Sequence, residues 1–162
     1  MRIREATEAD WPAIWPIVEA VVRAGETYTY PRDLTEAGGR TLWMQALPGV
    51  TLVAVDDDDR VLGTAKTGPN QMGPGSHVAT ASFMVGAEAR GRGVGRALGE
   101  AVIARAAADG YRAMQFNAVV ETNRSAVHLW KSLGFGIVGT VPEAFAHPTE
   151  GLVGLHVMHR RL

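Results

Sequence analysis

The sequence contains no cysteine in its 162 residues, and it carries no clear excess of charge of either sign. The first absence excludes disulfide bonds, thiolate metal sites and a cysteine nucleophile, and it fits a reducing compartment. The second follows from 16 lysine and arginine residues against 17 aspartate and glutamate residues. Because nucleic acids and anionic membrane surfaces attract proteins with an excess of positive charge, we expect neither as a partner.

Long apolar runs are also absent. No uninterrupted apolar stretch is long enough to span a bilayer, and the first five residues lack the apolar run of a signal peptide. We therefore expect a cytoplasmic protein. Apolar residues make up 46% of the chain and charged residues 20%, which is typical of one globular domain with a core of its own.

The sequence does contain apolar patterns that predict strands and helices along its whole length. The predicted strands are 3–6, 50–55, 60–67, 77–85, 113–120, 137–140 and 152–160. The predicted helices are 8–23, 33–47, 92–109 and a short helix that is capped by Asn123 or Ser125 and ends at Leu133. Pro16 should kink or split the first helix, and Gly25 should end it. The loops that join these elements include 26–32, 68–76 and 142–151.

Strands 77–85 and 113–120 flank one helix and should therefore be parallel, which predicts an α+β domain with a mixed sheet. Between strands 50–55 and 60–67 the four aspartates at 56–59 predict an acidic hairpin turn. Consecutive carboxylates at a turn are usually solvated. The five histidines show no metal-ligand spacing, so we expect no metal.

Residues 90–99 oppose the helix that follows them. The stretch holds four glycines and three arginines. A glycine inside a helix costs about 1 kcal/mol relative to alanine, and an arginine in the first turn costs about 0.3–1 kcal/mol against the helix dipole. A bound phosphate would explain both, since glycines allow a close approach to the backbone N–H groups and arginines stabilise negative charge. The alternative without a ligand is a glycine-rich turn with solvated arginines.

Two common phosphate-binding patterns fail at this junction. A P-loop requires lysine and then serine or threonine after its last glycine, whereas Arg96 and Ala97 follow Gly95. A dinucleotide-binding fingerprint requires a third glycine, and Leu98 occupies that position.

The pattern that does match is Arg/Gln-x-x-Gly-x-Gly/Ala, through Arg90, Gly93 and Gly95. It resembles the first cofactor segment of the GCN5-related N-acetyltransferase (GNAT) superfamily, and a stretch from Asn123 to Phe135 resembles the second. The resemblance covers nearly the whole chain. It implies a single acyl-CoA N-acyltransferase domain over residues 1–162, with a GNAT-like mixed, mostly antiparallel sheet, a splayed central pair of parallel strands and flanking helices.

The resemblance also implies that acetyl-CoA is the acyl donor. Backbone N–H groups at 92–96 would bind its pyrophosphate, and the strand at 83–85 would pair with its pantetheine arm. The N–H of Met84 or Val85 would stabilise the oxyanion. The residues implied to bind the cofactor are Phe83, Met84, Val85, Arg90, Gly91, Arg92, Gly93, Val94, Gly95, Arg96, Asn123, Ser125, Ala126 and Trp130.

The implied reaction is direct attack of an amine on a thioester. The central strand carries no carboxylate that could act as a base, so we expect a water held by Thr80, Asn117 or a backbone carbonyl, with Ser82 as a further candidate. Asn117 could equally make a structural hydrogen bond. Many family members have a tyrosine as general acid where this chain has Trp130, whose indole N–H cannot donate a proton.

The acceptor site should form from the loops 26–32, 66–76 and 142–151, with the last contributing His147. The candidate substrate-binding residues are Tyr28, Tyr30, Lys66 and Asn70. The two tyrosines could instead pack as a lid, and Lys66 with Arg32 could bind a carboxylate. The chain resembles acetyltransferases of proline analogues such as azetidine-2-carboxylate and, more distantly, the phosphinothricin type. The first group often has asparagine where this chain has Thr80.

We therefore expect a small-molecule amine acceptor that resembles an amino acid, and a homodimer is a further expectation. Two other functions remain open. One is a catalytically silent acyl-CoA-binding or sensor protein, which the absent base and Trp130 would suit. The other is a protein N-acetyltransferase that acts on an N-terminus or a lysine.

Overall fold

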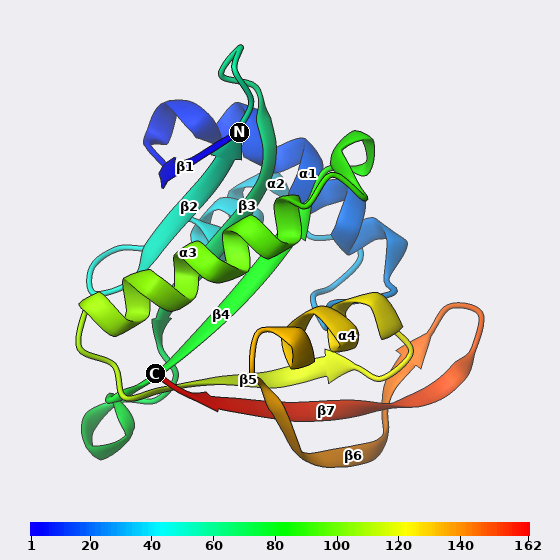
Figure 1. Ribbon diagram of the computed structural model, residues 1–162. Coiled ribbons are helices and arrows are strands. Elements are labelled where there is room, and N and C mark those ends of the chain that lie inside the picture. Colours follow the sequence, from blue (N-terminus) through cyan, green and yellow to red (C-terminus); the bar gives the residue numbers. More distant parts are fainter.

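The computed structural model describes residues 1–162 as a seven-stranded sheet with helices on both faces (Figure 1). The strands are β1 (Arg2–Glu5), β2 (Val50–Val55), β3 (Val61–Pro69), β4 (Val78–Val85), β5 (Ala113–Val120), β6 (Gly136–His147) and β7 (Gly151–Arg161). Their order in the sheet is β1-β2-β3-β4-β5-β7-β6. Only β4 and β5 are parallel, and every other pair is antiparallel. This confirms the predicted mixed sheet with one central parallel pair.

The helices are α1 (Trp11–Ala24), α2 (Glu36–Trp43), α3 (Val94–Ala108) and α4 (Arg124–Ser132), with short 3-10 turns at Glu8–Asp10, Gly73–Gly75 and Ala87–Ala89. Helices α3 and α4 pack on one face of the sheet, and α1 and α2 pack on the other. Leu98 and Val102 of α3 and Ile14 and Val18 of α1 are almost fully buried in these two layers. The sheet is thus enclosed along β2, β3 and β4, the part that leads to the splay.

Strands β4 and β5 pair over a short distance only. Val78 and Ala79 are in register with Ala113 and Met114, and no later residues of the two strands pair. Figure 1 shows the two strands diverging from this end, with α3 and α4 above the gap. The predicted splay is therefore present, and it opens toward the beginning of α3.

Helix α2 is shorter than predicted. The expected helix 33–47 ends at Trp43, because Thr51 of β2 takes over the hydrogen bonds that would continue it. The Thr51 hydroxyl donates to the Trp43 carbonyl at 2.8 Å and accepts from the Gln45 N–H at 3.0 Å. The chain therefore leaves the helix at residue 44, and residues 44–47, which were expected to be helical, form a loop together with Pro48 and Gly49. Helix α1, in contrast, is not split at Pro16 and continues to Ala24, where Gly25, with a φ of 68°, caps its end as predicted.

The C-terminal hairpin is longer than predicted. Residues 142–147, expected in a loop, continue β6, and only 148–150 form the turn. The residues that indicated a loop form an irregular part of the strand. The pairing register shifts between Val141 and Phe145, and Glu143 has a φ of 51°. A bulge of this kind accommodates Pro142 and lets the pairing with β7 resume. None of the helices is long and apolar enough to cross a membrane.

Candidate functional site

The glycine-rich junction forms a turn that leads into α3 with unpaired backbone N–H groups. Gly91 and Gly93 have φ values of 74° and 79°, in the left-handed region that favours glycine. Because of this conformation, helix α3 begins at Val94 and not at residue 92, where it was predicted to begin. No side chain caps its first turn. The first-turn N–H groups of Val94, Gly95 and Arg96 have no acceptor within the helix. Together with the positive end of the helix dipole they can hold an anion.

Gly95 has a different reason to be glycine. Its φ is not positive, and a Cβ built on it would meet Leu129 Cδ2 at 3.5 Å and Val85 Cγ2 at 3.9 Å, both ordinary contacts. Packing and backbone conformation therefore do not require glycine here, although it costs the helix about 1 kcal/mol relative to alanine. A ligand that approaches the backbone closely would explain the glycine.

Three arginines surround this turn, and they differ in what they contact. Arg96 donates to Ser132 Oγ at 2.8 Å and lies 3.6 Å from Glu100, so its side chain is directed toward α4. Arg90 and Arg92 are exposed and make neither an ion pair nor a side-chain hydrogen bond. They are the cations that remain available to an anionic ligand at the turn.

The open edge of β4 is defined by the alternation of its backbone groups, which point to opposite sides in successive residues. The Gly86 N–H donates to Leu62 O of β3, so Met84, two residues earlier, also faces β3. Phe83 and Val85 therefore face the gap. Of the two N–H groups predicted to stabilise an oxyanion, that of Val85 is directed into the gap and that of Met84 is not. The Met84 side chain is buried on the α1 face.

Tyr28, predicted to contact the acceptor, is bonded to this edge instead. Its hydroxyl donates to Phe83 O and accepts from Phe83 N, both at 2.8 Å. Its ring stacks on Tyr30 at 5.5 Å and meets Trp43 edge-on at 6.4 Å. Burial raises the pKa of Tyr28 well above its usual range, so the hydroxyl stays protonated.

Aromatic rings form the wall of the gap on the α3 and α4 side. The ring of Phe83 lies 4.6 Å from Trp130 and 5.9 Å from Phe116, and Phe116 stacks on Phe135 at 4.3 Å. Trp130 is 7% exposed within this cluster. Its position is that of a packing residue beside the expected path of the cofactor.

Asn123 caps the beginning of α4. Its Oδ1 accepts from the Ala126 N–H at 3.3 Å and from the Ser125 hydroxyl at 3.1 Å. The oxygen of this amide is therefore occupied, and its NH₂ group is the part that remains free for a ligand. Ser125 and Ala126, also predicted to bind the cofactor, are positioned by the same cap.

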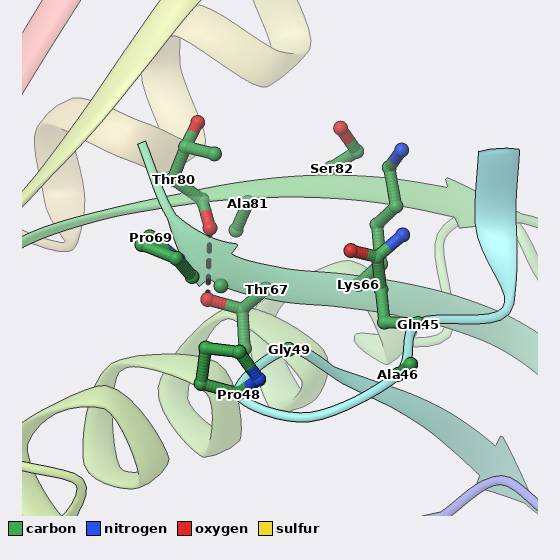
Figure 2. Close-up of a pocket in the computed structure, with 11 residues that line it drawn as sticks. Gln45, Ala46, Pro48, Gly49, Lys66, Thr67, Pro69, Thr80, Ala81 and Ser82 are labelled. Atoms are coloured by element: carbon green, nitrogen blue, oxygen red, sulfur yellow. Dashed lines mark hydrogen bonds between the residues drawn. The ribbon is translucent and has the colours of Figure 1, made fainter. Parts of the chain in front are cut away.

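On the opposite face of the sheet lies a pocket of about 260 Å³ (Figure 2). It is lined by Gln45, Ala46, Pro48, Gly49, Lys66, Thr67, Gly68, Pro69, Thr80, Ala81 and Ser82. Thr80, predicted to hold a catalytic water, lies in the lining of this pocket, and its carbonyl accepts from the Thr67 hydroxyl at 2.8 Å. The sequence pattern did not identify Gln45 as a lining residue, because it was expected to lie in the helix 33–47, nor Pro48 and Gly49, which were expected only to end that helix.

Lys66 is the only charged residue that lines this pocket. Its Nζ donates to Leu42 O at 2.6 Å and lies 5.7 Å and 5.4 Å from the ring centroids of Tyr30 and Trp43. No carboxylate pairs with it, and two of its three N–H donors remain free. Arg32, its expected partner, is not in the pocket and donates to the Arg23 carbonyl at 2.8 Å.

Asn117 and Asn70, predicted for separate roles, are in contact. Asn117 Nδ2 donates to Asn70 Oδ1 at 2.6 Å, and its Oδ1 accepts from Gln115 Nε2 at 2.9 Å. This chain of amides links β5 to the loop that follows β3. Gln115 carried no signal in the sequence, because a single amide in a strand has no motif. His147 is remote from the pocket and accepts from the Thr149 N–H at 3.3 Å in the β6–β7 turn.

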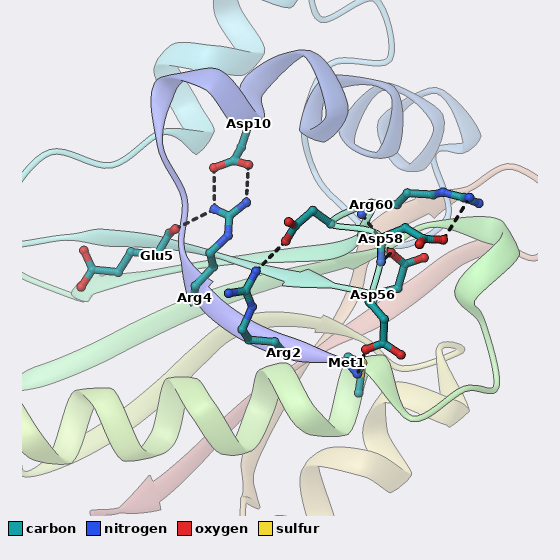
Figure 3. Close-up of polar contacts among 10 residues, drawn as sticks. Met1, Arg2, Arg4, Glu5, Asp10, Asp56, Asp58 and Arg60 are labelled. Carbon is teal, nitrogen blue, oxygen red and sulfur yellow. Dashed lines mark hydrogen bonds and ion pairs between the residues drawn. The ribbon is translucent and has the colours of Figure 1, made fainter.

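An ion pair joined by two hydrogen bonds lies at the beginning of α1, away from the gap. Figure 3 shows Arg4 bound to Asp10 through two hydrogen bonds of 2.8 Å, close to a group of exposed charges that includes Arg2 and Asp58. The hydrogen bonds from Arg4 hold the pKa of Asp10 far below its usual range. Since Asp10 also accepts from the Thr7 N–H at 2.7 Å, this pair fixes the start of α1. No cluster of three or more metal-ligating side chains occurs.

The chain is similar in sequence and in fold to known proteins. A family model described as the acetyltransferase (GNAT) family matches residues 3–135. A solved GCN5-related N-acetyltransferase from Kribbella flavida is 60% identical, with 99% of this chain and 97% of that chain covered and a TM-score of 0.97. A solved GNAT superfamily phosphinothricin acetyltransferase from Sinorhizobium meliloti, in complex with AcCoA, is 24% identical, with 99% and 88% covered and a TM-score of 0.89, which shows a shared fold.

One curated relative is the N-acetyltransferase aca1 of Schizosaccharomyces pombe. It is 31% identical over 97 residues, which are 60% of this chain and 46% of the relative. The match therefore spans less than half of that protein's length.

Proposed function

The chain belongs to the acetyltransferase (GNAT) family, and from that premise we propose that it acetylates the amine of a small acceptor that carries a carboxylate. It is an N-acetyltransferase that uses acetyl-CoA. The proposal concerns the acceptor and the residues that bind each substrate. The single observation that carries it is Lys66, an unpaired cation in a pocket that no acidic residue lines.

For the donor, the first-turn N–H groups of Val94, Gly95 and Arg96 would bind the pyrophosphate. Arg90 and Arg92, which have no partner in the chain, would add positive charge. The open edge of β4 at Val85 would pair with the pantetheine arm, as an added strand would. The thioester would then lie in the gap between β4 and β5, with the aromatic wall on one side and the pocket on the other.

For the acceptor, the pocket offers one cation and several neutral polar groups. A carboxylate bonded to Lys66 would direct the amine of a small amino-acid-like molecule toward Thr80, Ser82 and the gap. A pocket of about 260 Å³ suits a molecule of that size better than a folded protein surface. A lysine without an ion-pair partner binds a carboxylate well, since such hydrogen bonds are charge-assisted.

The chemistry places few demands on side chains. The amine must lose a proton, and no carboxylate or histidine lines the pocket. We propose that water held by Thr80 and Ser82 accepts it, or that the acceptor enters as the free amine. The leaving thiolate needs no strong acid, because a thiol pKa near 8.5 lies only about 1–1.5 units above neutral pH. Trp130 would then serve as packing.

The experiment is a thiol-release assay with acetyl-CoA and a panel of amines. The panel contains amino acids, azetidine-2-carboxylate and phosphinothricin, the carboxamide of each, and a peptide with an N-terminal alanine. We expect free carboxylates to be preferred over their carboxamides. Equal rates for both would contradict the role of the carboxylate, and a preference for the peptide would indicate a protein acceptor. Binding of acetyl-CoA without thiol release for any amine would indicate a silent binder.

A variant of the pocket tests the residue itself. Lys66→Met should lower kcat/KM about 10- to 100-fold for carboxylate acceptors, because a charge-assisted hydrogen bond is worth about 1.5–3 kcal/mol. The same change should have little effect on carboxamides. Lys131→Met is the matched control, since Lys131 is the other lysine of the chain and lies exposed in the last turn of α4. Equal effects of Lys66→Met on both acceptor types would contradict the assignment.

A further inference from the structure

The open edge of β4 carries one bond that the acetyl-transfer scheme does not use. The Tyr28 hydroxyl takes both backbone groups of Phe83, the N–H and the carbonyl, at 2.8 Å each. No other side chain bonds to the side of β4 that faces the gap. In a sheet these two groups would pair with a neighbouring strand, and here β5 has already diverged. The hydroxyl therefore occupies the place of a strand.

The Tyr28 hydroxyl lies at the edge of β4 between the two proposed substrate sites. The anion-binding turn and α3 lie on one face of the sheet, and the pocket with Lys66 lies on the other. Tyr28 packs among the residues of α1, α2 and β4 on the pocket's face and reaches Phe83 through the gap. A group that enters from the acceptor face can thus contact the Phe83 peptide directly.

The choice of Phe83 over Val85 follows from the length of β4. Both residues face the gap, and Val85 lies nearer to the turn at 91–96. Phe83 lies about 6.6 Å farther along the strand, toward the pocket. A pantetheine arm that pairs at Val85 would bring its thioester to Phe83. An oxygen atom, that of Tyr28, already accepts a hydrogen bond from the Phe83 N–H with good geometry.

We propose that Tyr28 reserves the acyl-oxygen site in the free enzyme, and that the acetyl oxygen of acetyl-CoA displaces its hydroxyl from the Phe83 N–H. The inference rests on the proposed cofactor site in the gap. An N–H group that stabilises an oxyanion must be available during the reaction. In the free enzyme, however, an N–H without a hydrogen-bond partner in a half-buried strand is unfavourable. The single hydroxyl of Tyr28 accepts a hydrogen bond from this N–H and can be replaced by another oxygen atom. A neighbouring strand would have to break several hydrogen bonds to be displaced.

One consequence is an order of binding. If the proposal holds, the hydroxyl that is bonded to Phe83 occupies the acyl-oxygen site until acetyl-CoA displaces it. The acceptor amine can therefore reach the reacting carbon only after acetyl-CoA has taken the Phe83 N–H. Tyr28 remains protonated, because burial keeps its pKa above the usual range, and it can return to Phe83 when the product leaves.

The test compares acetyl-CoA with CoA, which has no acyl oxygen. Dissociation constants are measured by calorimetry for the wild type, Tyr28→Phe and Tyr30→Phe. Tyr28→Phe removes the competing hydroxyl, so it should raise the preference for acetyl-CoA over CoA about three- to tenfold, the worth of about one neutral hydrogen bond. Tyr30→Phe should leave this ratio unchanged, because the Tyr30 hydroxyl makes no hydrogen bond although its ring stacks on Tyr28.

The affinity for CoA shows whether each variant retains the fold and the pyrophosphate site. If Tyr28→Phe changes both affinities equally, the hydroxyl has only a structural role and the inference is overturned. A lower preference for acetyl-CoA also overturns it, since Tyr28 would then donate to the acyl oxygen rather than yield to it. Should the wild type bind neither ligand, the proposed cofactor site itself fails. In the wild type and in Tyr28→Phe, the infrared band of a ¹³C-labelled acetyl carbonyl should shift to lower frequency on binding, because the Phe83 N–H donates to its oxygen.

Discussion

Replacement of Gly95 by aspartate should separate the stability of the fold from the affinity for the cofactor. A Cβ at this position meets only Leu129 and Val85 at ordinary distances, and the backbone φ is not positive. Aspartate has a higher helix propensity than glycine, and a negative charge in the first turn of α3 interacts favourably with the helix dipole. We expect the free energy of unfolding to rise by about 0.5–1 kcal/mol.

The same carboxylate should repel the pyrophosphate. At about 5 Å and an effective dielectric constant near 20, repulsion amounts to about 3 kcal/mol per unit of charge. We therefore expect acetyl-CoA to bind at least about 100-fold more weakly. Gly93→Asp is a poorer probe, because a φ of 79° strains any side chain and would lower the stability as well.

Calorimetry with acetyl-CoA and urea denaturation of the free protein measure the two quantities. Gly95→Asn is the matched control, since it has the same size without the charge and should bind far better than Gly95→Asp. Gly139→Asp is a remote control, because a Cβ at Gly139 has open space around it in β6. An unchanged affinity in Gly95→Asp would refute the assignment of the cradle. Equal losses in the aspartate and asparagine variants would refute the electrostatic reasoning.

Three further predictions concern the acid, the base and the ion pair. Trp130→Phe should keep kcat within about threefold and leave the pH profile unchanged, because an indole N–H cannot supply a proton; a loss of more than 30-fold, about 2 kcal/mol, would contradict this. The rate should rise with pH up to the pKa of the acceptor's own amine, so two acceptors with different amine pKa values should give shifted profiles, and one common inflection would indicate a base on the enzyme. Asp10→Asn should lower the free energy of unfolding by about 1.5–3 kcal/mol at neutral pH. Since folding lowers the pKa of Asp10, that stability is present above about pH 4 and is lost as the pH falls further, and urea denaturation should find this acid dependence weakened in the variant.

The sequence was most informative where a local rule was broken. The glycines and arginines at 90–96 oppose a helix, and this conflict alone indicated an anion site at the start of α3. The periodic patterns also predicted each of the main helices and strands. They failed at the ends of elements, where a distant residue decides. Thr51 ends α2 at Trp43, and pairing with β7 carries β6 through Pro142 and Glu143.

The local sequence thus determined the family and the fold class, and it indicated the proposed phosphate site of the donor, because each depends on residues that are neighbours in the chain. Only the tertiary structure decided what lies across the gap. It joined Tyr28 to Phe83, 55 positions away, and Asn117 to Asn70, 47 positions away. It also left Lys66 without a carboxylate. Contacts between segments so far apart depend on how the sheet splays and how the loops pack over it, and no periodicity or motif encodes them.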